Sequence, residues 1–352
     1  MTNPAEGPLL AGIVTKAARR YGDRAAFRLT ANAGSSTAGE LSYRELDRAT
    51  DEAAVGLAAR GIGADSVLLL SLPSGTDYAV AYLAAAKVGA TTAGANPRLQ
   101  ARERALLVDT VGPDLVLATG SLSAGIPADQ RVEVVEPCDD PGRPLLALRN
   151  SGDVAPIASA DPDRPTCICF TSGSTGDPRG VWFTDRQLAA IHDLDTGGVW
   201  GSGGHMVSGT AFAHVGVMTK IGWQLASGAT IHVMDRWTAA GLLDLIERYR
   251  LPVVNGVAAQ IALLMQEPGF ERRDLSCIQS IVVGAGPSPP ALVTEARARF
   301  GAPYVIRYSS TESGGIGLST GLGADDDEAL LVRVHVRLLQ PNHETEKRDS
   351  AC

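Results

Sequence analysis

A loop rich in glycine and hydroxyl side chains carries the clearest chemical signal in the sequence. It follows the apolar run of residues 166–170 and contains, in order, Thr171, Ser172, Gly173, Ser174, Thr175, Gly176 and, three positions later, Arg179. Glycines let backbone N–H groups approach a ligand, hydroxyls donate hydrogen bonds, and arginine supplies positive charge. A flexible linker is the usual alternative for such a composition. Because this loop directly follows a strand-like run and has no repeated Gly-Ser unit, we predict that it binds phosphate.

The loop differs from that of the P-loop nucleoside triphosphatases. Those proteins place a Gly-Lys pair, followed by Ser or Thr, at a fixed distance from the first glycine. Here the sixth position after Gly173 is Arg179, and the Gly-Lys pair does not occur at that spacing. The sequence therefore favours a phosphate-binding loop of another kind.

Three other short segments contain residues that can bind an anion, a base or a metal ion. They comprise His214, then Gly284, Ala285 and Gly286, and then Tyr308, Thr311 and Glu312. Each has an ordinary structural explanation when taken alone, since a lone histidine is commonly structural and a Thr-Glu pair can cap a helix. His192, His205 and His232 have no distinctive flanks, and we expect them to be surface or core residues.

These segments resemble the motifs of the adenylate-forming superfamily, which includes acyl-CoA synthetases, peptide-synthetase adenylation domains and luciferases. The loop of residues 171–180 is similar to the superfamily signature, with only its lysine replaced, by Arg179. Five further similar segments occur in the superfamily's order, at residues 41–47, 84–97, 212–216, 284–287 and 308–312. The resemblance covers residues 9 to about 318. One match could arise by chance, but the ordered series indicates membership.

The resemblance implies an α/β fold of layered, doubly wound, largely parallel sheets with flanking helices. It also implies that a carboxylic acid is activated by ATP to an acyl adenylate, with Mg²⁺ as cofactor and coenzyme A or a carrier protein as candidate acceptors. The phosphate loop would hold the β- and γ-phosphates, Thr311 the α-phosphate, and Glu312 the Mg²⁺. A single protein carboxylate suits Mg²⁺, which commonly keeps several waters.

The same resemblance assigns the base and the acid. Tyr308 would stack on adenine, with Gly284, Ala285 and Gly286 as the wall that lets the ring approach the backbone. His214 would lie beside the acyl carboxylate, and the acyl pocket would be lined by Trp223, Val254, Gly256 and Gly314. Amino-acid-activating relatives carry an Asp near residues 212–217 to pair with the substrate ammonium, and this stretch has no acid. A small carboxylic acid without an α-amine is therefore the expected substrate.

Two kinds of departure from the pattern concern ATP and the C-terminal region. Ile306 stands where relatives carry an Asn or Gln that bonds adenine, and Ser309 replaces a glycine. Neither the superfamily's Thr-Gly-Asp motif nor the Lys of its C-terminal domain is found, so the resemblance implies a body truncated before the β subdomain and that domain. We expect turnover to be impaired, or to depend on a separate C-terminal domain or carrier protein.

The elements that must position these residues follow a strand–helix alternation. Strands are predicted at residues 25–30, 66–71, 115–117, 132–135, 231–233, 253–254 and 281–283, and helices at 9–21, 43–60, 77–88 and 239–249. Residues 136–165 are rich in Pro, Asp, Gly and Ala and predict a surface connection between two lobes. We predict a first lobe at residues 1–160, a second with the phosphate loop and pockets at 161–320, and a tail at 321–352 with one strand and then disorder.

Composition excludes several function classes. The net charge of −8 gives no overall positive field for nucleic acid, and no apolar segment reaches the length of a bilayer span. We expect a cytoplasmic protein, and a homodimer is a candidate assembly. Cys167 and Cys169 flank Ile168 in an apolar run, where strand alternation predicts two small buried side chains on one face.

Three functions remain open at this point. The first is an enzyme of the acyl-CoA synthetase or AMP-forming acyl ligase kind, favoured by Thr171, Thr175, Thr311 and Glu312. The second is a non-catalytic acyl- or adenylate-binding protein, and the third is the same scaffold repurposed for other chemistry. The departures from the superfamily pattern favour the last two.

Overall fold

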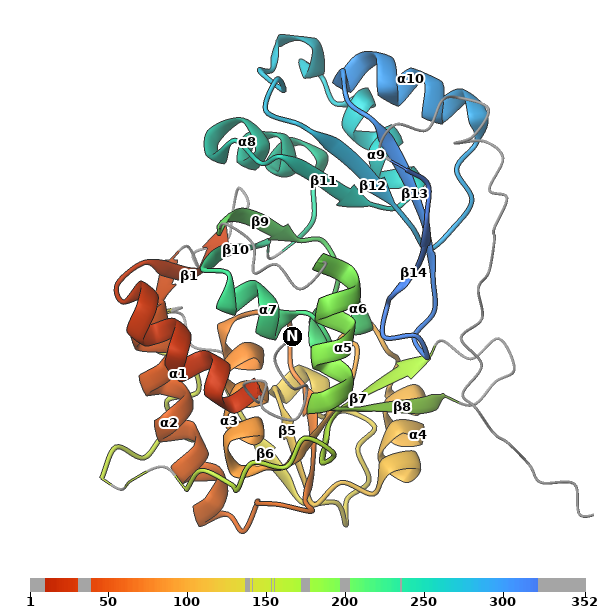
Figure 1. Ribbon diagram of the computed structural model, residues 1–352. Coiled ribbons are helices and arrows are strands. Elements are labelled where there is room, and N and C mark those ends of the chain that lie inside the picture. Colours follow the sequence, from red (N-terminus) through yellow and green to blue (C-terminus); the bar gives the residue numbers. More distant parts are fainter. Residues whose placement is uncertain are drawn as a thin grey trace, which may run out of the picture.

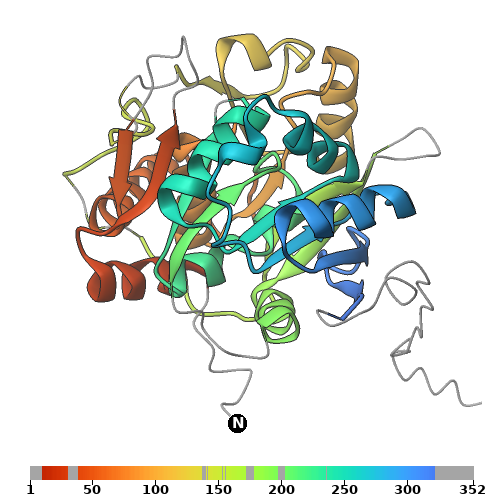
Figure 2. The same ribbon diagram turned by 90° about the horizontal axis from the view of Figure 1, so that it is seen from above.

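The computed structural model describes residues 10–30, 39–136, 140, 142–152, 154, 156–171, 178–196, 203–234 and 236–321. Residues 172–177 of the predicted phosphate loop and the predicted tail strand lie outside the described residues. Within the described part the chain forms two bodies, with the smaller one above the larger one (Figure 1). Seen from above, the first helix, in red, lies at one side of the larger body (Figure 2).

The larger body contains two sheets. The six-stranded sheet has the order β6-β5-β3-β4-β7-β8, with β3 (Val67–Ser71), β4 (Thr91–Gly94), β5 (Leu115–Ala118), β6 (Val132–Val134), β7 (Pro165–Thr171) and β8 (Arg179–Thr184). The four-stranded sheet has the order β2-β1-β10-β9, with β1 (Ala25–Thr30), β2 (Gly39–Ser42), β9 (Gly204–Ser208) and β10 (Ala229–Met234). In each sheet only the pair at one edge, β7–β8 or β1–β2, is antiparallel.

The smaller body is a third sheet of the same design. Its order is β11-β12-β13-β14, with β11 (Val253–Gly256), β12 (Ser280–Val283), β13 (Tyr304–Ser309) and β14 (Gly317–Ser319). Only β13–β14 is antiparallel. Helices α8 (Ala239–Tyr249), α9 (Ala258–Gln266), α10 (Pro290–Phe300) and the short 3₁₀ turn η3 (Phe270–Arg272) belong to this body. The predicted fold of largely parallel sheets with flanking helices is confirmed.

The helices of the larger body bury apolar residues in its core. They are α1 (Leu10–Tyr21), α2 (Tyr43–Ala59), α3 (Thr76–Val88), α4 (Ala101–Val111), α5 (Asp185–Thr196), α6 (Val215–Met218), α7 (Ile221–Ala226) and the 3₁₀ turn η2 (Gly120–Leu122). Helix α3 is made of small and apolar residues and is buried on nearly all sides, as expected for a helix without a polar face. It ends at Gly89 in the left-handed conformation (φ 81°), which glycine adopts without strain.

An ion cluster around the fully buried Lys87 joins α2 to α3. Lys87 Nζ lies 2.7 Å from Asp47 Oδ1 and 2.6 Å from Asp51 Oδ1, and the lysine side chain has no exposed surface. Thr15 Oγ1 of α1 donates to the same Asp47 oxygen at 2.9 Å. The cluster therefore links the first three helices through one buried charge.

The strands and helices found by sequence patterning are confirmed, several of them to within a residue. The strand at residues 25–30 and the helix at 239–249 have the predicted bounds. The two cysteines at 167 and 169 are buried free thiols on β7, as predicted. Strand pairs cross the predicted lobe boundary at residue 160, because β1 pairs with β10 and β4 with β7. The buried clusters divide instead near Met234, which begins the second one. The division into lobes at residue 160 stays a prediction.

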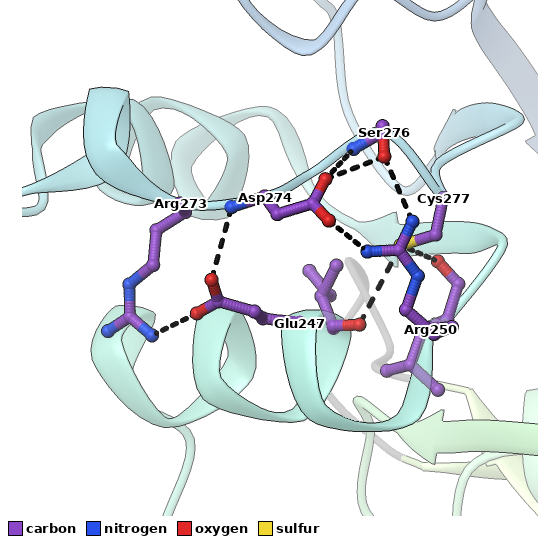
Figure 3. A network of polar contacts seen from close by, with 8 residues as sticks. Glu247, Arg250, Arg273, Asp274, Ser276 and Cys277 are labelled. Atoms are coloured by element: carbon purple, nitrogen blue, oxygen red, sulfur yellow. Dashed lines mark hydrogen bonds and ion pairs between the residues drawn. The ribbon is translucent and has the colours of Figure 1, made fainter.

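Helix α8 is fastened to the segment that precedes β12 by a polar network (Figure 3). Arg250 lies 2.5 Å from Asp274, Arg273 lies 3.0 Å from Glu247, and the Asp274 amide donates to Glu247 at 3.1 Å. Hydrogen bonds from Ser276 lower the pKa of Asp274 to about 2, with help from Arg250. The network fixes the end of α8 and hence the start of β11.

Among the described residues, no helix is long and apolar enough to cross a membrane.

Two histidines connect the four-stranded sheet to α8. His205 Nδ1 lies 2.9 Å from His232 Nε2, and the ring of Tyr249 lies 4.3 Å from that of His232. His232 is buried, and burial, His205, Arg28 and Arg248 lower its pKa to about 4. The structure thus holds this imidazole neutral, with Arg28 also stacked over Tyr249.

We expect the stability of the protein to fall as the pH drops from about 6.5 to about 4. In that window the unfolded chain binds a proton at residue 232 and the folded chain does not, so the free energy of unfolding decreases with falling pH. The full effect is about 3 kcal/mol. Denaturant unfolding of wild type and His232→Gln at several pH values measures it, and the wild-type curve should be the steeper one. Parallel curves would contradict the assignment.

Candidate functional site

The two described ends of the predicted phosphate loop lie opposite one another. Thr171 ends β7 and Arg179 begins β8, and the two residues are direct partners in the antiparallel register. Arg179 is exposed and Thr171 is half-buried. Ser172, Gly173, Ser174, Thr175 and Gly176 lie outside the described residues, between these two ends. The loop is therefore the connection of a hairpin at one edge of the six-stranded sheet.

His214 begins the short helix α6. Its Nδ1 accepts a hydrogen bond of 3.0 Å from the Gly216 N–H, which caps the helix and leaves Nε2 as the protonated nitrogen of a neutral ring. The residue reaches the surface, yet protein atoms around the imidazole partly desolvate it and lower its pKa. His214 therefore presents a neutral N–H donor, which can bond a carboxylate oxygen.

The predicted adenine-binding residues meet at the carboxyl ends of the third sheet. The Gly284 amide donates to the Gly256 carbonyl at 3.2 Å, and a Cβ on Gly284 would lie 3.2 Å from the Arg307 carbonyl. Ala285 has a positive φ of 62°, unusual for a residue with a side chain, and such strain occurs often at functional turns. The side chain of Tyr308 on the neighbouring strand is 68% exposed, which leaves its ring free to stack.

Gly314 is the point where the turn after β13 contacts α5, β8 and the segment after α6. It lies in the turn after β13 that contains Thr311 and Glu312, with a φ of 68°. A Cβ there would lie 2.2 Å from Ile191 of α5 and 3.4 Å from Phe183 of β8, the strand that begins with Arg179. The Gly314 carbonyl accepts a hydrogen bond of 3.1 Å from Thr219 Oγ1, just after the helix that His214 begins. Figure 1 shows β13 and β14 reaching beside α5 and α6.

The residues predicted to line the acyl pocket are not gathered in one place by any described contact. Val254 is buried in the second core cluster with the helices of the smaller body. Gly256 ends β11 beside Gly284. Trp223 is half-buried on α7, with its ring 6.4 Å from that of His192. The Trp223 Nε1 is buried and has no hydrogen-bond partner among the described residues. Their role as a pocket stays a prediction.

A buried ion cluster that the sequence patterns did not reveal lies beside these elements. Asp195 Oδ2 of α5 is 2.6 Å from Lys220 Nζ, and Asp195 Oδ1 is 2.5 Å from Arg307 Nη2. Burial alone raises the pKa of Asp195, but the two cations outweigh it and hold that pKa below its usual value. Burial lowers the pKa of Lys220, and Asp195 offsets this only in part. The position of Arg307 next to Tyr308 was the available clue in the sequence.

The donor set is compatible with ATP and Mg²⁺. Thr171, Arg179 and the His214 ring offer hydrogen-bond donors for phosphate and carboxylate oxygens, and Tyr308 offers an exposed ring. Glu312 is exposed, and no described side chain forms an ion pair with it. No group of three or more His, Cys, Asp or Glu side chains among the described residues is placed to hold a metal ion. A Mg²⁺ held by Glu312 would therefore take its other oxygens from phosphate and water.

Comparison with known proteins identifies the family. The model of the AMP-binding enzyme family matches residues 14–345. The chain belongs to this family. This establishes the membership that the sequence motifs predicted. The relatives include CoA ligases named for acyl and aryl acids.

The relatives differ in the acid they are named for. The chain is 27% identical over 284 residues to an indoleacetate–CoA ligase of Aromatoleum aromaticum, covering 78% of this chain and 56% of that protein. It is 26% identical over 306 residues to the long-chain-fatty-acid–CoA ligase FadD13 of Mycobacterium tuberculosis, covering 82% and 58%. The chain thus spans about half the length of the curated relatives it matches.

Solved structures confirm the fold. The inhibitor-bound N-terminal domain of FACL13 from Mycobacterium tuberculosis superimposes with a TM-score of 0.78 at 23% sequence identity, covering 90% of this chain and 79% of that one. A benzoate CoA ligase from Burkholderia xenovorans gives a TM-score of 0.75 at 20% identity, covering 90% and 64%. At this identity the similarity concerns the fold.

We expect Gly314→Ala to destabilise the protein by about 1–3 kcal/mol, because the new Cβ meets Ile191 and the positive φ disfavours any side chain. Chemical denaturation measures the change. Gly63→Ala is the matched control, since a Cβ there meets nothing within 4 Å and its φ is not positive. An equal effect of the two substitutions would show that the turn is not closely packed.

Proposed function

We propose that this protein activates a carboxylic acid without an α-amino group, by forming an acyl adenylate from ATP. The observation that carries the proposal is the meeting at Gly314 of three elements. These are the turn with Thr311 and Glu312, the strand β8 that begins with Arg179, and the segment after His214. Membership of the AMP-binding enzyme family and the CoA ligases among its relatives support the same reaction.

The proposed reaction is an in-line displacement at phosphorus. A carboxylate oxygen of the acid attacks the α-phosphorus, the bond to the bridging oxygen breaks, and pyrophosphate leaves with the electron pair. Thr171, Arg179 and the remainder of the phosphate loop bind the β- and γ-phosphates, and Thr311 binds the α-phosphate. Mg²⁺ held by Glu312 supplies charge neutralisation on the phosphates. Alignment and fixed charges of this kind account for most of the rate enhancement in phosphoryl transfer.

His214 orients the acid in this scheme. Its neutral Nε2–H donates to one carboxylate oxygen, which directs the other oxygen at phosphorus. Tyr308 stacks on adenine against Gly284, Ala285 and Gly286. The acid is proposed to reach toward Trp223, and coenzyme A or a carrier protein is proposed to accept the acyl group.

A non-catalytic acyl- or adenylate-binding protein is the second candidate. It is favoured by Ile306, whose side chain packs against the second core cluster and offers adenine no hydrogen bond. A finer part of the main proposal is that these 352 residues depend on further chain for full turnover, since they match about half the length of their relatives.

We expect the purified protein with ATP, Mg²⁺ and a panel of fatty and aryl acids to release pyrophosphate with at least one acid. Replacement of Glu312 by Gln should abolish this release and the Mg²⁺-dependent binding of ATP, because the metal loses its protein carboxylate. A coupled pyrophosphate assay and calorimetry measure the two effects. Glu295→Gln on α10 is the matched control. Binding of ATP and an acyl-AMP mimic without any pyrophosphate release would favour the second candidate.

We expect Arg179→Ala to weaken the binding of ATP more than that of AMP. The side chain is proposed to contact only the β- and γ-phosphates, which AMP lacks. Calorimetry gives, for each nucleotide, the ratio of the variant's dissociation constant to that of the wild type. Arg186→Ala, which removes an exposed arginine paired with Asp163, serves as the control. Equal losses for ATP and AMP would give this hairpin a different role.

A further inference from the structure

One carboxylate joins the two halves of the proposed site. Asp195 uses one oxygen for Lys220, at 2.6 Å, and the other for Arg307, at 2.5 Å. Its side chain is 9% exposed, that of Lys220 10% and that of Arg307 33%. Because each oxygen has its own cation, loss of the carboxylate would release both elements at once.

The two cations belong to different elements. Lys220 lies between α6 and α7, six residues after His214, and its Cε lies 3.8 Å from the position of a Cβ on Gly315. Arg307 immediately precedes Tyr308 on β13, and its Cβ lies 3.8 Å from the position of a Cβ on Gly284. Successive side chains of a strand point to opposite faces, so the contact of Arg307 with α5 directs Tyr308 to the other face.

We propose that Asp195 is a positioning residue that sets the acid-binding and nucleotide-binding parts of the site in register. The inference rests on the proposed function. Through Lys220, Asp195 holds the helix junction behind His214. Through Arg307, it holds the end of β13 that carries Tyr308 and leads into Thr311 and Glu312. Small misplacements of groups that orient reactants cost large factors in rate, which makes such a shared anchor effective.

A second buried cluster gives the comparison that separates positioning from stability. The buried Lys87 also lies between two carboxylates, Asp47 and Asp51, but it joins α2 to α3 within the larger body. Replacement of Lys87 removes the buried cation and leaves Asp47 and Asp51 close together without it, which destabilises the fold. Lys87→Met should therefore lower the melting temperature and leave the kinetic constants of the folded protein unchanged.

The experiment compares six substitutions in the full chain, one of them the conservative Arg307→Lys, with pyrophosphate release as the assay. Lys220→Met and Arg307→Met each remove one of the two ion pairs of Asp195, and each leaves Asp195 with its other cation. Asp195→Asn removes both ion pairs. Lys87→Met and Arg299→Met are the controls, since Arg299 is likewise paired with two carboxylates, Glu271 and Glu295. Melting temperatures identify the range in which every variant is folded, and kinetics are measured there.

We expect the Arg307 and Lys220 variants to affect the binding of different substrates. Arg307→Met should raise the KM for ATP and lower kcat/KM for ATP by about 10²-fold, with the KM for the acid nearly unchanged. Lys220→Met should do the reverse, raising the KM for the acid. Asp195→Asn should combine both losses, and Arg307→Lys should recover part of the ATP affinity. If Asp195→Asn does not fold, Lys220→Met and Arg307→Met still test the proposal.

Two results overturn the inference alone. Either Lys220→Met and Arg307→Met show wild-type kinetics, like Lys87→Met, or each of them changes the KM for ATP and the KM for the acid equally. A wild-type protein that releases no pyrophosphate with any acid overturns the proposed function, and this inference with it. The failure of one is therefore distinguished from the failure of the other by the wild-type activity.

Discussion

The close approach of the turn after β13 to α5, α6 and β8 is the constraint on which the candidate site depends. Glycine is strongly favoured at position 314, where a Cβ would lie 2.2 Å from the end of the Ile191 side chain and the backbone has a positive φ. That absence of a side chain lets the smaller body place Thr311 and Glu312 beside elements of the larger one. Two of the three sheets each contribute one edge to this arrangement: the hairpin β7–β8 from the six-stranded sheet and β13–β14 from the third.

The antiparallel edges have a common physical explanation. In a parallel sheet, functional residues gather where the strands end in loops, at the carboxyl edge. A hairpin at the edge of such a sheet returns the chain at once, so Thr171 and Arg179 stay opposite each other at the two ends of the phosphate loop. The β13–β14 hairpin likewise returns the chain after Glu312, with Tyr308 paired to Leu318. Both hairpins hold a loop at both of its ends, which limits where its donors can lie.

The sequence predicted most of the regular elements and the family, and it did so for separable reasons. Hydrophobic patterning located β1, β3, α3 and α8. Helical spacing of apolar residues marks α8, and continuous runs of apolar or small residues mark β3 and α3, which are buried on nearly all sides. The superfamily motifs predicted His214, Tyr308 and Glu312 as site residues, and these roles stay predictions. It did not locate Asp195, Lys220 and Arg307. Their pairing joins residues 112 and 25 positions apart in the chain, and nothing local to any one of them distinguishes a buried ion pair from a solvated charge.

The two buried charge clusters have the same chemistry and differ in what they connect. In the Lys87 cluster, one cation and two carboxylates join helices that already pack along their length. In the Asp195 cluster, one carboxylate and two cations join elements that belong to different cores, with Arg307 from the smaller body and the other two residues from the larger. Apolar packing between two bodies tolerates sliding, because the hydrophobic effect has no direction. A carboxylate with a cation on each oxygen tolerates little, because its hydrogen bonds are short and directional and an unpaired buried charge is costly. A charged anchor at this boundary therefore fixes relative position as well as contact, which is what a site divided between two bodies requires.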